Sequence, residues 1–297
     1  MTITIIGLGL IGGSMALELK ARGFAQEPHR LVGVDNNSQH GKEALRLGIV
    51  DELMSLEEGV KAAGLIIIAV PVNHAPLILQ QILPLLNDDQ VVIDVGSTKG
   101  EICLAVHDHE RRPCFVATHP IAGTEKSGPS AAHVGLFHNK INIICEKHKS
   151  SPTALALVEE LYAFLKMSTI YMDPVEHDKH IAYVSHLSHI SSFMLGLTVL
   201  EMEASEKNIF NMAGSGFEST VRLAKSSPDM WAPIFEQNKE HISTALGSYI
   251  EQLILFKSYI DEGKSDMTHM LMSRANDIKR VLDGIPLKSK ILSNNNV

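Results

Sequence analysis

The chain has 297 residues, which is comfortable for two domains and large for a single core. Hydrophobic residues make up 45% of it and charged residues 20%, and the formal net charge is -8. This is the composition of a globular protein, and the negative charge without any basic block argues against nucleic acid or an anionic membrane as a partner.

The first 171 residues alternate apolar strands with helices. Strands are predicted at 2–6, 31–34, 65–70, 91–95, 115–118 and 141–145, and helices at 12–22, 42–47, 75–86 and 153–166. Strands such as "LIIIAV" are apolar on both faces, which is typical of parallel strands covered by helices on both sides. We therefore predict a Rossmann-type domain at residues 1–171, an α/β domain with a doubly wound, mostly parallel sheet.

Beyond residue 171 the pattern is all helical. Helical patterns cover 177–202, 229–260 and 265–282, and the Ser-Ser-Pro-Asp run at 226–229 marks a break followed by a new helix start. We predict a second, all-α domain at residues 172–297. Its apolar stretches, such as "LGLTVLEM" and "YIEQLILF", indicate core and subunit interface, so a homodimer with exchanged or interleaved helices is expected.

The sequence shows no targeting or membrane signal. A strand begins almost at the first residue, without a basic or apolar leader, and no apolar run is long enough to span a bilayer. The three cysteines, Cys103, Cys114 and Cys145, form no CxxC pair, and an odd number suits free thiols in a reducing compartment. We expect a cytoplasmic protein.

The stretch "GLGLIG" at residues 7–12 follows the first strand and opens the first helix. It fits the pattern G-x-G-x-x-G, in which Gly7 permits a tight turn, Gly9 lets the backbone approach a pyrophosphate and Gly12 lets helix and strand pack closely. The helix start, which includes Leu10 and Ile11, supplies N–H groups to the phosphates. A dinucleotide site is predicted, with a ligand-free glycine turn and an FAD site as the alternatives.

Asp35 favours NAD as the dinucleotide. It ends the second predicted strand, about twenty residues beyond the glycines, where a carboxylate accepts hydrogen bonds from the ribose hydroxyls and repels a 2′-phosphate. Val70 and Pro71 end the next strand, and Ser97 follows the one after it. These three residues would lie along the carboxyl edge of the sheet, where a nicotinamide extends toward a substrate, which argues against FAD.

Side chains capable of acid–base chemistry follow the later strands or lie in the helical domain. His119 comes directly after "FVAT", and the two histidines of "SHLSH", three residues apart, lie on one helix face. Each has an ordinary alternative: His119 could satisfy a backbone carbonyl, and Arg222 could form a surface ion pair. The histidine pair could bind a metal, but no Asp, Glu or Cys ligand pattern joins it, so we predict no metal. His177 and His180 are predicted to lie in a solvated first helical turn.

Five stretches together resemble the prephenate dehydrogenase family of tyrosine biosynthesis. They are "GLGLIGGS", "DVGSTKG", "HPIAGTEKSG", "HDKHIAYVSHLSH" and "GSGFESTVRLAKSSPDMW", in the family's order, and the resemblance runs from residue 1 to about residue 283. The His-Pro-x-x-Gly and Ser-His-Leu-x-His stretches are hard to match together elsewhere. The resemblance implies a Rossmann domain followed by a helical dimerisation domain, in agreement with the two domains predicted above.

The resemblance also implies an activity, the oxidative decarboxylation of prephenate by NAD⁺ to 4-hydroxyphenylpyruvate and CO₂. A hydride leaves C4 of the substrate ring, the 4-hydroxyl loses its proton and the ring carboxylate departs. By their match to the family's motifs, His119 takes the proton, and Ser97 helps to place the hydroxyl and the nicotinamide. The implied substrate-binding residues are Arg222 for a carboxylate, His189 for the substrate side chain, and Ser185 and Trp231 as further pocket positions.

Other functions stay open. Arogenate dehydrogenases share much of the pattern, and His189 favours prephenate because relatives that prefer arogenate can lack this histidine. Ser188 stands where many relatives have Pro, a change that should be harmless in a helix. A β-hydroxyacid dehydrogenase would be expected to use a lysine where this helix has histidines, and an NAD-sensing module would not need the Ser97, His119 and Arg222 set. A fused chorismate mutase or ACT domain is not expected.

Overall fold

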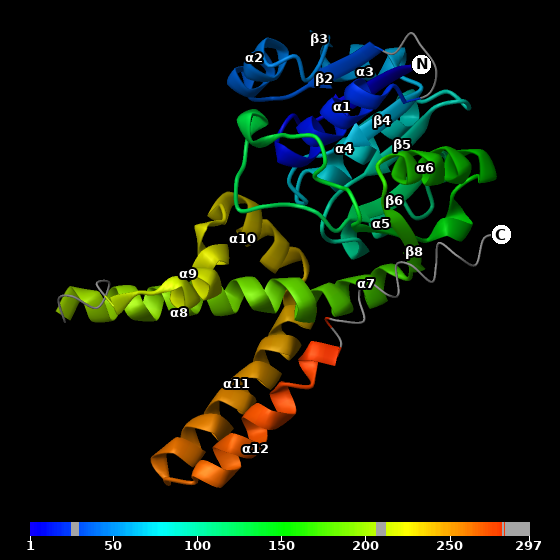
Figure 1. Cartoon of the computed structure of the whole chain (residues 1–297). Coiled ribbons are helices and arrows are strands. Elements are labelled where there is room, and N and C mark those ends of the chain that lie inside the picture. Colours follow the sequence, from blue (N-terminus) through cyan, green and yellow to red (C-terminus); the bar gives the residue numbers. More distant parts are fainter. Residues whose placement is uncertain (25–29, 206–211, 281, 283–297) are drawn as a thin grey trace. The chain divides into compact units, whose positions relative to one another are not determined.

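The structure is a computed structural model that describes residues 1–24, 30–205, 212–280 and 282 (Figure 1). Within these residues, strands and helices alternate up to residue 172, and helices follow from residue 174. The predicted order of an α/β part followed by an all-α part is confirmed.

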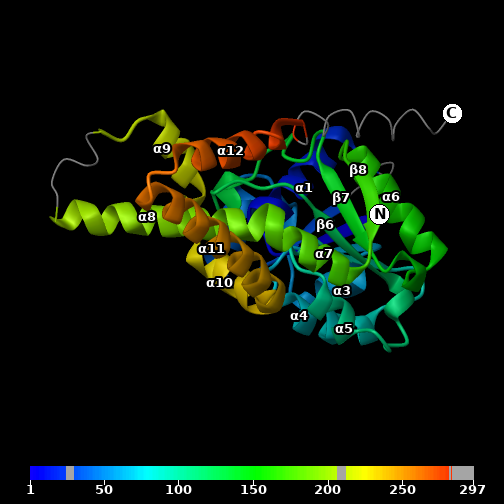
Figure 2. The same cartoon turned by 90° about the horizontal axis from the view of Figure 1, so that it is seen from below.

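Eight strands form one sheet in the order β3-β2-β1-β4-β5-β6-β7-β8. All neighbours are parallel except β6 and β7, and Figure 2 shows β6, β7 and β8 side by side. The first six places follow the order of the Rossmann fold, so the predicted doubly wound, mostly parallel sheet is confirmed. The strands are β1 (Thr2–Ile6), β2 (Arg30–Val34), β3 (Glu52–Leu53), β4 (Leu65–Ile68), β5 (Val91–Asp94), β6 (Phe115–Pro120), β7 (Ile141–Cys145) and β8 (Ser168–Met172).

Helices cover both faces of the sheet. Helices α1, α2 and α6 build a core on one face, and α3, α4 and α5 build a second core on the other. Every residue of β4 and β5 is therefore buried, which explains why these strands read as continuous apolar runs. The elements are α1 (Leu10–Arg22), α2 (Ser38–Arg46), α3 (Leu56–Ala62), α4 (Ala75–Ile82), η1 (Leu83–Leu85), α5 (Gly100–Ala105), η2 (Arg112–Cys114), η3 (Pro129–Ala131), η4 (Lys147–Lys149) and α6 (Pro152–Phe164).

A nearly continuous helix leaves the sheet after β8. It begins where the Asp173 carboxylate accepts the N–H groups of Val175 and Glu176, with Pro174 in the first turn. The helix predicted at 177–202 is confirmed, with one π-helical turn inside it that the apolar period does not show. The elements are α7 (Pro174–Ile181), the π turn η5 (Ala182–His186), α8 (Leu187–Ser205), α9 (Ser215–Val221), η7 (Arg222–Lys225) and α10 (Pro228–Gln237).

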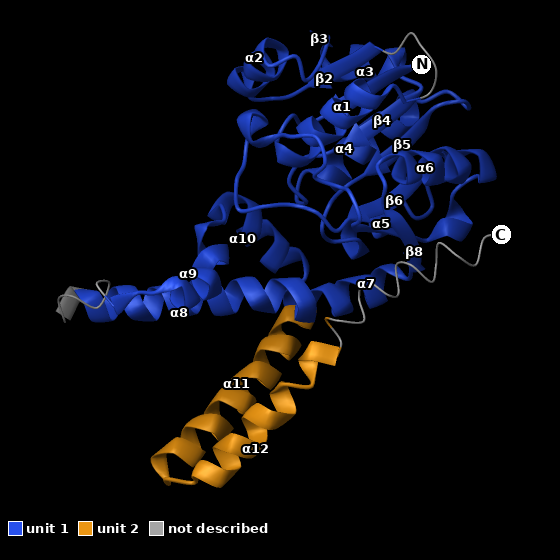
Figure 3. Ribbon diagram, in the orientation of Figure 1, with its two compact units in different colours: residues 1–239 blue, residues 240–297 orange. Residues whose placement is uncertain are grey.

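The chain divides into two compact units, residues 1–239 and residues 240–297 (Figure 3). The second unit contains α12 (Ser265–Ala275) and all but the first residue of α11 (Lys239–Asp261). The single helix predicted at 229–260 is wrong, because α10 and α11 are separated at Asn238. The predicted boundary after residue 171 divides sheet from helices, a different kind of division, and it stays a prediction. In the part of the chain that the structure describes, no helix is long and apolar enough to cross a membrane.

Two strands, β3 and β8, are not predicted from the sequence. Strand β3 has two residues, and no residue of β8 is fully buried. Both are edge strands of the sheet, so neither carries the doubly apolar pattern of the central strands. Helices α3 and α5 were also not predicted, since seven and six residues are too few to show a helical period.

Candidate active site

The glycine turn joins β1 to α1 at the carboxyl edge of the sheet. Gly7 has a φ of 96°, and a Cβ there would lie 2.4 Å from a backbone carbonyl oxygen at the end of β4. A Cβ at Gly12 would lie 2.1 Å from the carbonyl oxygen of Gly7, whereas one at Gly9 would meet no atom within 4 Å. Packing thus requires Gly7 and Gly12, while Gly9 leaves an open face at the start of α1, where Leu10 and Ile11 form the first turn. A phosphate fits that open face, because the first N–H groups of a helix lack partners within the helix.

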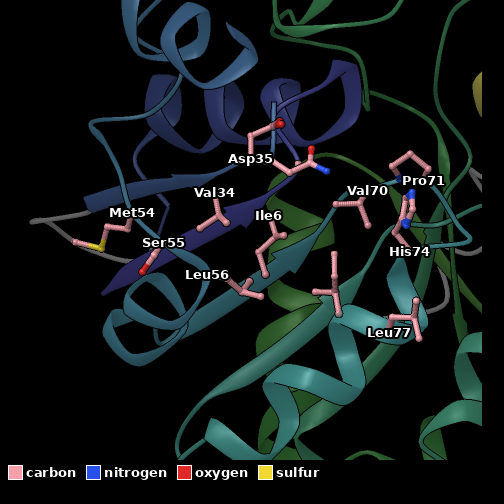
Figure 4. A pocket seen from close by; sticks show the side chains of 13 residues that line it. Ile6, Val34, Asp35, Met54, Ser55, Leu56, Val70, Pro71, His74 and Leu77 are labelled. Atoms are coloured by element: carbon pink, nitrogen blue, oxygen red, sulfur yellow. The ribbon is translucent and has the colours of Figure 1, made fainter. Parts of the chain in front are cut away.

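A pocket of about 460 Å³ lies beside this turn (Figure 4). Asp35 contributes its carboxylate to the wall, with Oδ2 accepting the N–H of Leu8 at 2.9 Å and Oδ1 accepting that of Asn37 at 2.8 Å. These bonds hold a negative charge in the pocket, which suits ribose hydroxyls and repels a 2′-phosphate. The predicted cofactor-binding residues that line the pocket are Gly7, Asp35, Val70 and Pro71.

A buried ion pair links the end of β5 to β6 next to His119, the predicted base. The fully buried ammonium of Lys99 bonds the carboxylate of Asp94, the last residue of β5. It also donates to the backbone carbonyl of Thr118 at 2.7 Å. Thr118 immediately precedes His119 in β6, so this pair fixes the end of the strand that presents the histidine.

His119 lies inside the protein, 8% exposed, and its Nδ1 is 2.8 Å from Nε2 of His177. His177 is only 1% exposed, so its predicted place in a solvated helical turn is wrong, whereas His180 is exposed as predicted. The reason is that α7 contacts α5 and turns the His177 side toward the sheet edge. Burial lowers the pKa of His119 well below its ordinary value, and the nearby His177, Lys99 and His186 lower it further. His119 is therefore neutral at neutral pH.

Three aromatic rings meet where α8 faces α10. His189 stacks on Trp231 with ring centroids 3.6 Å apart, and His186 meets the same indole edge-on at 5.8 Å. The Nδ1–H of His189 donates to the backbone carbonyl of Ser185 at 3.0 Å, so Nε2 of His189 carries the free lone pair. Burial also lowers the pKa of His189, which is therefore neutral.

His186 and Trp231 each present a buried N–H without an acceptor. The side-chain amide of Asn238 lies 3.2 Å from Nδ1 of His186 and donates to it, which places the ring proton on Nε2. Burial lowers the pKa of His186 to about 4, so the ring is neutral. Within the described residues, neither His186 Nε2 nor Trp231 Nε1 has a hydrogen-bond partner. Because buried donors are almost always paired, these two groups point to an acceptor on a ligand or a water.

Arg222 begins η7 and lies 53% exposed. Its Nη1 is 3.2 Å from Oε2 of Glu125, a residue of the loop that follows β6. The position of Arg222 is thus compatible both with the implied binding of a substrate carboxylate and with a surface ion pair. Arg222 lies in η7, which packs against α8, the helix that carries His189, and its charge lowers the pKa of His189 after the larger effect of burial.

The two predicted serines are both partly exposed. Ser97 lies in the loop between β5 and α5, and Ser185 lies in the π turn η5. No hydrogen bond within the described residues joins Ser97 to His119. The structure therefore brings His189, Ser185 and Trp231 together, with Arg222 on the short helix that packs against α8, and it leaves the role of Ser97 a prediction.

Three buried residues around His119 are not identified by the motifs: Lys99, His177 and Asp178. Lys99 stands in "DVGSTKG" five residues after Asp94, a lysine and an aspartate at the end of a buried strand, which is a recognisable signal for a buried pair. The adjacent His-Asp of 177–178 directly follows a helix start at the sheet edge. Its burial depends on α7 packing against α5, which no local pattern reports. Across the described residues, no group of three or more His, Cys, Asp or Glu side chains is placed to hold a metal ion.

Two family models match the chain. "Prephenate dehydrogenase, nucleotide-binding domain" matches residues 15–171, and "Prephenate dehydrogenase, dimerization domain" matches residues 173–274. Among relatives, prephenate dehydrogenase of Bacillus subtilis is 32% identical over 292 residues, covering 97% of this chain and 77% of that protein. Cyclohexadienyl dehydrogenase of Zymomonas mobilis is 28% identical over 270 residues, covering 89% and 90%.

Solved structures of prephenate and arogenate dehydrogenases are also similar to this chain. Prephenate dehydrogenase of Aquifex aeolicus, in complex with hydroxyphenyl propionate and NAD⁺, has a TM-score of 0.85 at 31% identity and covers 94% of this chain and 97% of that one. Arogenate dehydrogenase of Synechocystis has a TM-score of 0.74 at 27% identity and covers 95% and 100%. Both likenesses extend over the sheet and the helices that follow it.

The variant Asp35→Asn tests the dinucleotide pocket. It keeps the shape of the side chain and removes the negative charge. The KM for NAD⁺ should therefore rise about ten-fold, and the preference for NAD⁺ over NADP⁺ in kcat/KM should fall by a similar factor. Steady-state kinetics with each dinucleotide measure both. Asp51→Asn is the matched control, because Asp51 also accepts a backbone N–H, from Leu31 at 2.9 Å, and does not line the pocket. An unchanged NAD⁺/NADP⁺ ratio in Asp35→Asn would contradict the assignment.

Proposed function

Because this chain belongs to the prephenate dehydrogenase family, we propose that it oxidises and decarboxylates prephenate with NAD⁺ as the hydride acceptor. The products are 4-hydroxyphenylpyruvate, CO₂ and NADH, and the reaction serves tyrosine biosynthesis. The observation that carries this proposal is the buried, neutral His119 at the same sheet edge as the glycine turn. A base and a dinucleotide site on one edge are the two parts that the reaction needs.

The nucleotide end of the site fits NAD⁺, which supplies the hydride acceptor when bound. The open face at Gly9 would hold the pyrophosphate, and the carboxylate of Asp35 would accept hydrogen bonds from the ribose hydroxyls. Val70 and Pro71, at the exit of β4, line the pocket on the side that leads along the carboxyl edge toward β5 and β6.

At the other end His119 accepts the proton of the 4-hydroxyl. Loss of that proton and of the hydride from C4 converts the alcohol carbon to a carbonyl carbon, and the ring carboxylate then leaves as CO₂ while the ring becomes aromatic. The aromatic product makes the overall step favourable. The protein therefore has to hold the hydroxyl at His119 and C4 at the hydride acceptor, and Ser97 is proposed to help with that placement.

The remaining polar groups anchor a dianion. Arg222 binds one carboxylate of prephenate, and exchanging Glu125 for the substrate leaves the guanidinium paired in both states. Ser185 in η5 and His189 in α8 face the substrate side chain, beside the indole of Trp231. The unpaired N–H groups of His186 and Trp231 supply the buried donors that oxygen atoms of such a substrate require.

Arogenate is the second candidate substrate, because arogenate dehydrogenase of Synechocystis is among the similar structures. Arogenate carries an ammonium group where prephenate carries a keto oxygen. His189 favours prephenate, since the groups around it include the cationic Arg222 and an N–H donor of Trp231, which suit an oxygen better than an ammonium group.

The proposed assembly is a cytoplasmic homodimer formed through the helical domain. The family model over residues 173–274 is that of a dimerization domain. Large apolar side chains are exposed on α8, among them Met194 and Leu200, and on α11, among them Leu253 and Ile254. Exposed apolar patches of this kind mark protein interfaces.

Replacement of the base by Asn should abolish proton transfer and preserve binding. In His119→Asn we expect kcat to fall about 10³-fold, with the KM for prephenate changed less than about three-fold, because only the transition state uses the base. NADH formation at 340 nm measures both constants. His180→Asn, an exposed histidine on the adjoining helix, is the control. A kcat that survives in His119→Asn would remove this residue from the base role.

Truncation of the arginine should weaken substrate binding. In Arg222→Ala we expect the KM for prephenate to rise about 10- to 100-fold, the equivalent of one lost bond between charged groups. The KM for NAD⁺ should stay unchanged. Lys225→Ala is the control, since Lys225 lies in the same short helix and pairs with Glu218 instead. Equal effects of the two variants would rule out a specific carboxylate clamp.

The proposed dimer predicts a mass in light scattering of twice the 32.5 kDa of one chain. Ile254→Glu places a charge in the apolar surface of α11, where the side chain is 62% exposed, and should shift the mass toward the monomer. Leu104→Glu, on the exposed side of α5, should leave the mass unchanged. A wild-type protein of monomeric mass would refute the proposed assembly.

A further inference from the structure

A chain of hydrogen bonds runs from Nδ1 of His119 through His177 to Asp178. His119 Nδ1 lies 2.8 Å from His177 Nε2, and the two rings meet edge-on with centroids 5.0 Å apart. His177 Nδ1 lies 2.7 Å from Oδ1 of Asp178. All three side chains are buried, so water does not compete for these bonds. The geometry is a base backed by a second imidazole and a carboxylate.

Asp178 is fixed from the opposite side by the start of α5. Its Oδ1 accepts the backbone N–H of Lys99, and its Oδ2 accepts that of Gly100, both at 2.8 Å. A Cβ at Gly100 would lie 2.9 Å from Oδ2, so the glycine is what lets the carboxylate approach. Burial alone would raise the pKa of Asp178, but the bonds from His177, Gly100 and Lys99 outweigh it and lower the pKa. Asp178 is therefore an ionised carboxylate, which accepts hydrogen bonds and donates none.

The position of each ring proton follows from that carboxylate. Because Asp178 only accepts, His177 must carry its proton on Nδ1, and Nε2 of a neutral His177 is then a lone pair. His119 faces this lone pair with Nδ1, so its own proton must sit on Nδ1. The lone pair of His119 is left on Nε2, the nitrogen that the substrate hydroxyl needs.

We infer that His177 and Asp178 are positioning residues of this enzyme, which lock His119 in the tautomer that exposes the Nε2 lone pair and stabilise the imidazolium formed when it takes the substrate proton. This inference rests on the proposed function of His119 as the base. In the step itself the O–H bond of the 4-hydroxyl breaks and an N–H bond forms at Nε2 of His119. The proton on Nδ1 stays in its bond to His177, and the new positive charge is shared along the chain toward the carboxylate of Asp178. The proton leaves to solvent after the product departs.

The other charged or titratable groups near His119 make this support necessary. Lys99 lies on the β5 side and His186 on η5, and both disfavour a positive charge on His119, as His177 also does whenever it is itself charged. Asp94 is occupied by Lys99. Asp178, reached through His177, is the carboxylate that the hydrogen bonds connect to the base.

Two substitutions at one position separate hydrogen bonding from packing. His177→Gln keeps an acceptor, Oε1, near the place of Nε2, whereas His177→Phe keeps a flat ring and leaves the Nδ1–H of His119 without an acceptor. We expect kcat for prephenate oxidation to fall about 10³-fold in His177→Phe and less than about ten-fold in His177→Gln, with the KM for prephenate and for NAD⁺ within about three-fold of wild type in both. His180→Phe, exposed on the same helix, should match wild type.

Two kinetic results would overturn the inference. One is a His177→Phe enzyme with kcat within about three-fold of wild type. The other is a His177→Gln enzyme as slow as His177→Phe, which would show that a hydrogen-bond acceptor at this position does not support the base. His119→Asn in the same assay keeps the two proposals apart, because a fully active His119→Asn enzyme removes the base role itself and not only its support.

The tautomers are also measurable in the wild-type protein, without turnover. In protein labelled with ¹⁵N-histidine, long-range ¹H–¹⁵N spectra distinguish a ring protonated on Nδ1 from one protonated on Nε2. The chain has 15 histidines, and the signals of interest are those that disappear in His119→Asn and His177→Gln. We expect a proton on Nδ1 of both rings and none on Nε2 of His119. A proton on Nε2 of His119 would overturn the inference, even if His177→Phe failed to fold.

Discussion

The fully buried ammonium of Lys99 is the interaction on which the site depends. It bonds Asp94 at the end of β5 and the backbone carbonyl of Thr118 in β6, while the backbone N–H of Lys99 itself bonds Asp178 on α7. One residue thus ties together three elements that are far apart in the sequence. Removing one partner from a buried ion pair costs about 3–5 kcal/mol, so other placements of these elements are strongly disfavoured. His119, the next residue after Thr118, is therefore presented in one orientation.

The π turn η5 brings His177, which lies before it, and His186, its last residue, to the same side of the long helix. In a regular α-helix His177 and His186, nine residues apart, would point in directions about 180° apart. One extra residue in the turn makes nine residues equivalent to eight, and the angle falls to about 80°. The side-chain amide of Asn238 bonds both Nδ1 of His186 and the backbone carbonyl of Asp178, the residue after His177, so the two histidines lie on the same side. His189 follows on the next turn and stacks on Trp231. The irregular turn, rather than the amphipathic pattern, thus sets which side chains of the long helix face the same side.

The sequence predicts those parts of the fold and the site whose cause is local. The glycine turn and Asp35 are readable because a close backbone approach and a strand-end carboxylate each need one residue type at one spacing. The burial of His177 is not readable, because it results from α7 packing against α5, some 80 residues away in the chain. The break between α10 and α11 at Asn238 cannot be predicted from the sequence either, since apolar residues continue at a helical period through it. Family resemblance supplies roles for His119 and Arg222, but the hydrogen-bonded support behind the base becomes visible only when the elements are assembled.

The low pKa of an unliganded His119 has a consequence for how the base meets its substrate. Burial, and after it the neighbouring His177, Lys99 and His186, favour the neutral ring of His119, so its lone pair is available before prephenate arrives, at the cost of a weaker base. A substrate with two carboxylates reverses this balance on binding, because negative charge placed near a buried imidazole raises its pKa. In the proposed complex, Arg222 and the unpaired N–H donors of His186 and Trp231 would hold that charge close by without transferring a proton themselves. The base would therefore become stronger only when the correct anion is in place, and the ionised Asp178 would provide the rest of the stabilisation through His177. On this proposal, basicity in the site would be a property of the enzyme–substrate complex, and the hydrogen bonds from His119 through His177 to Asp178 would allow the buried ring to accept a positive charge.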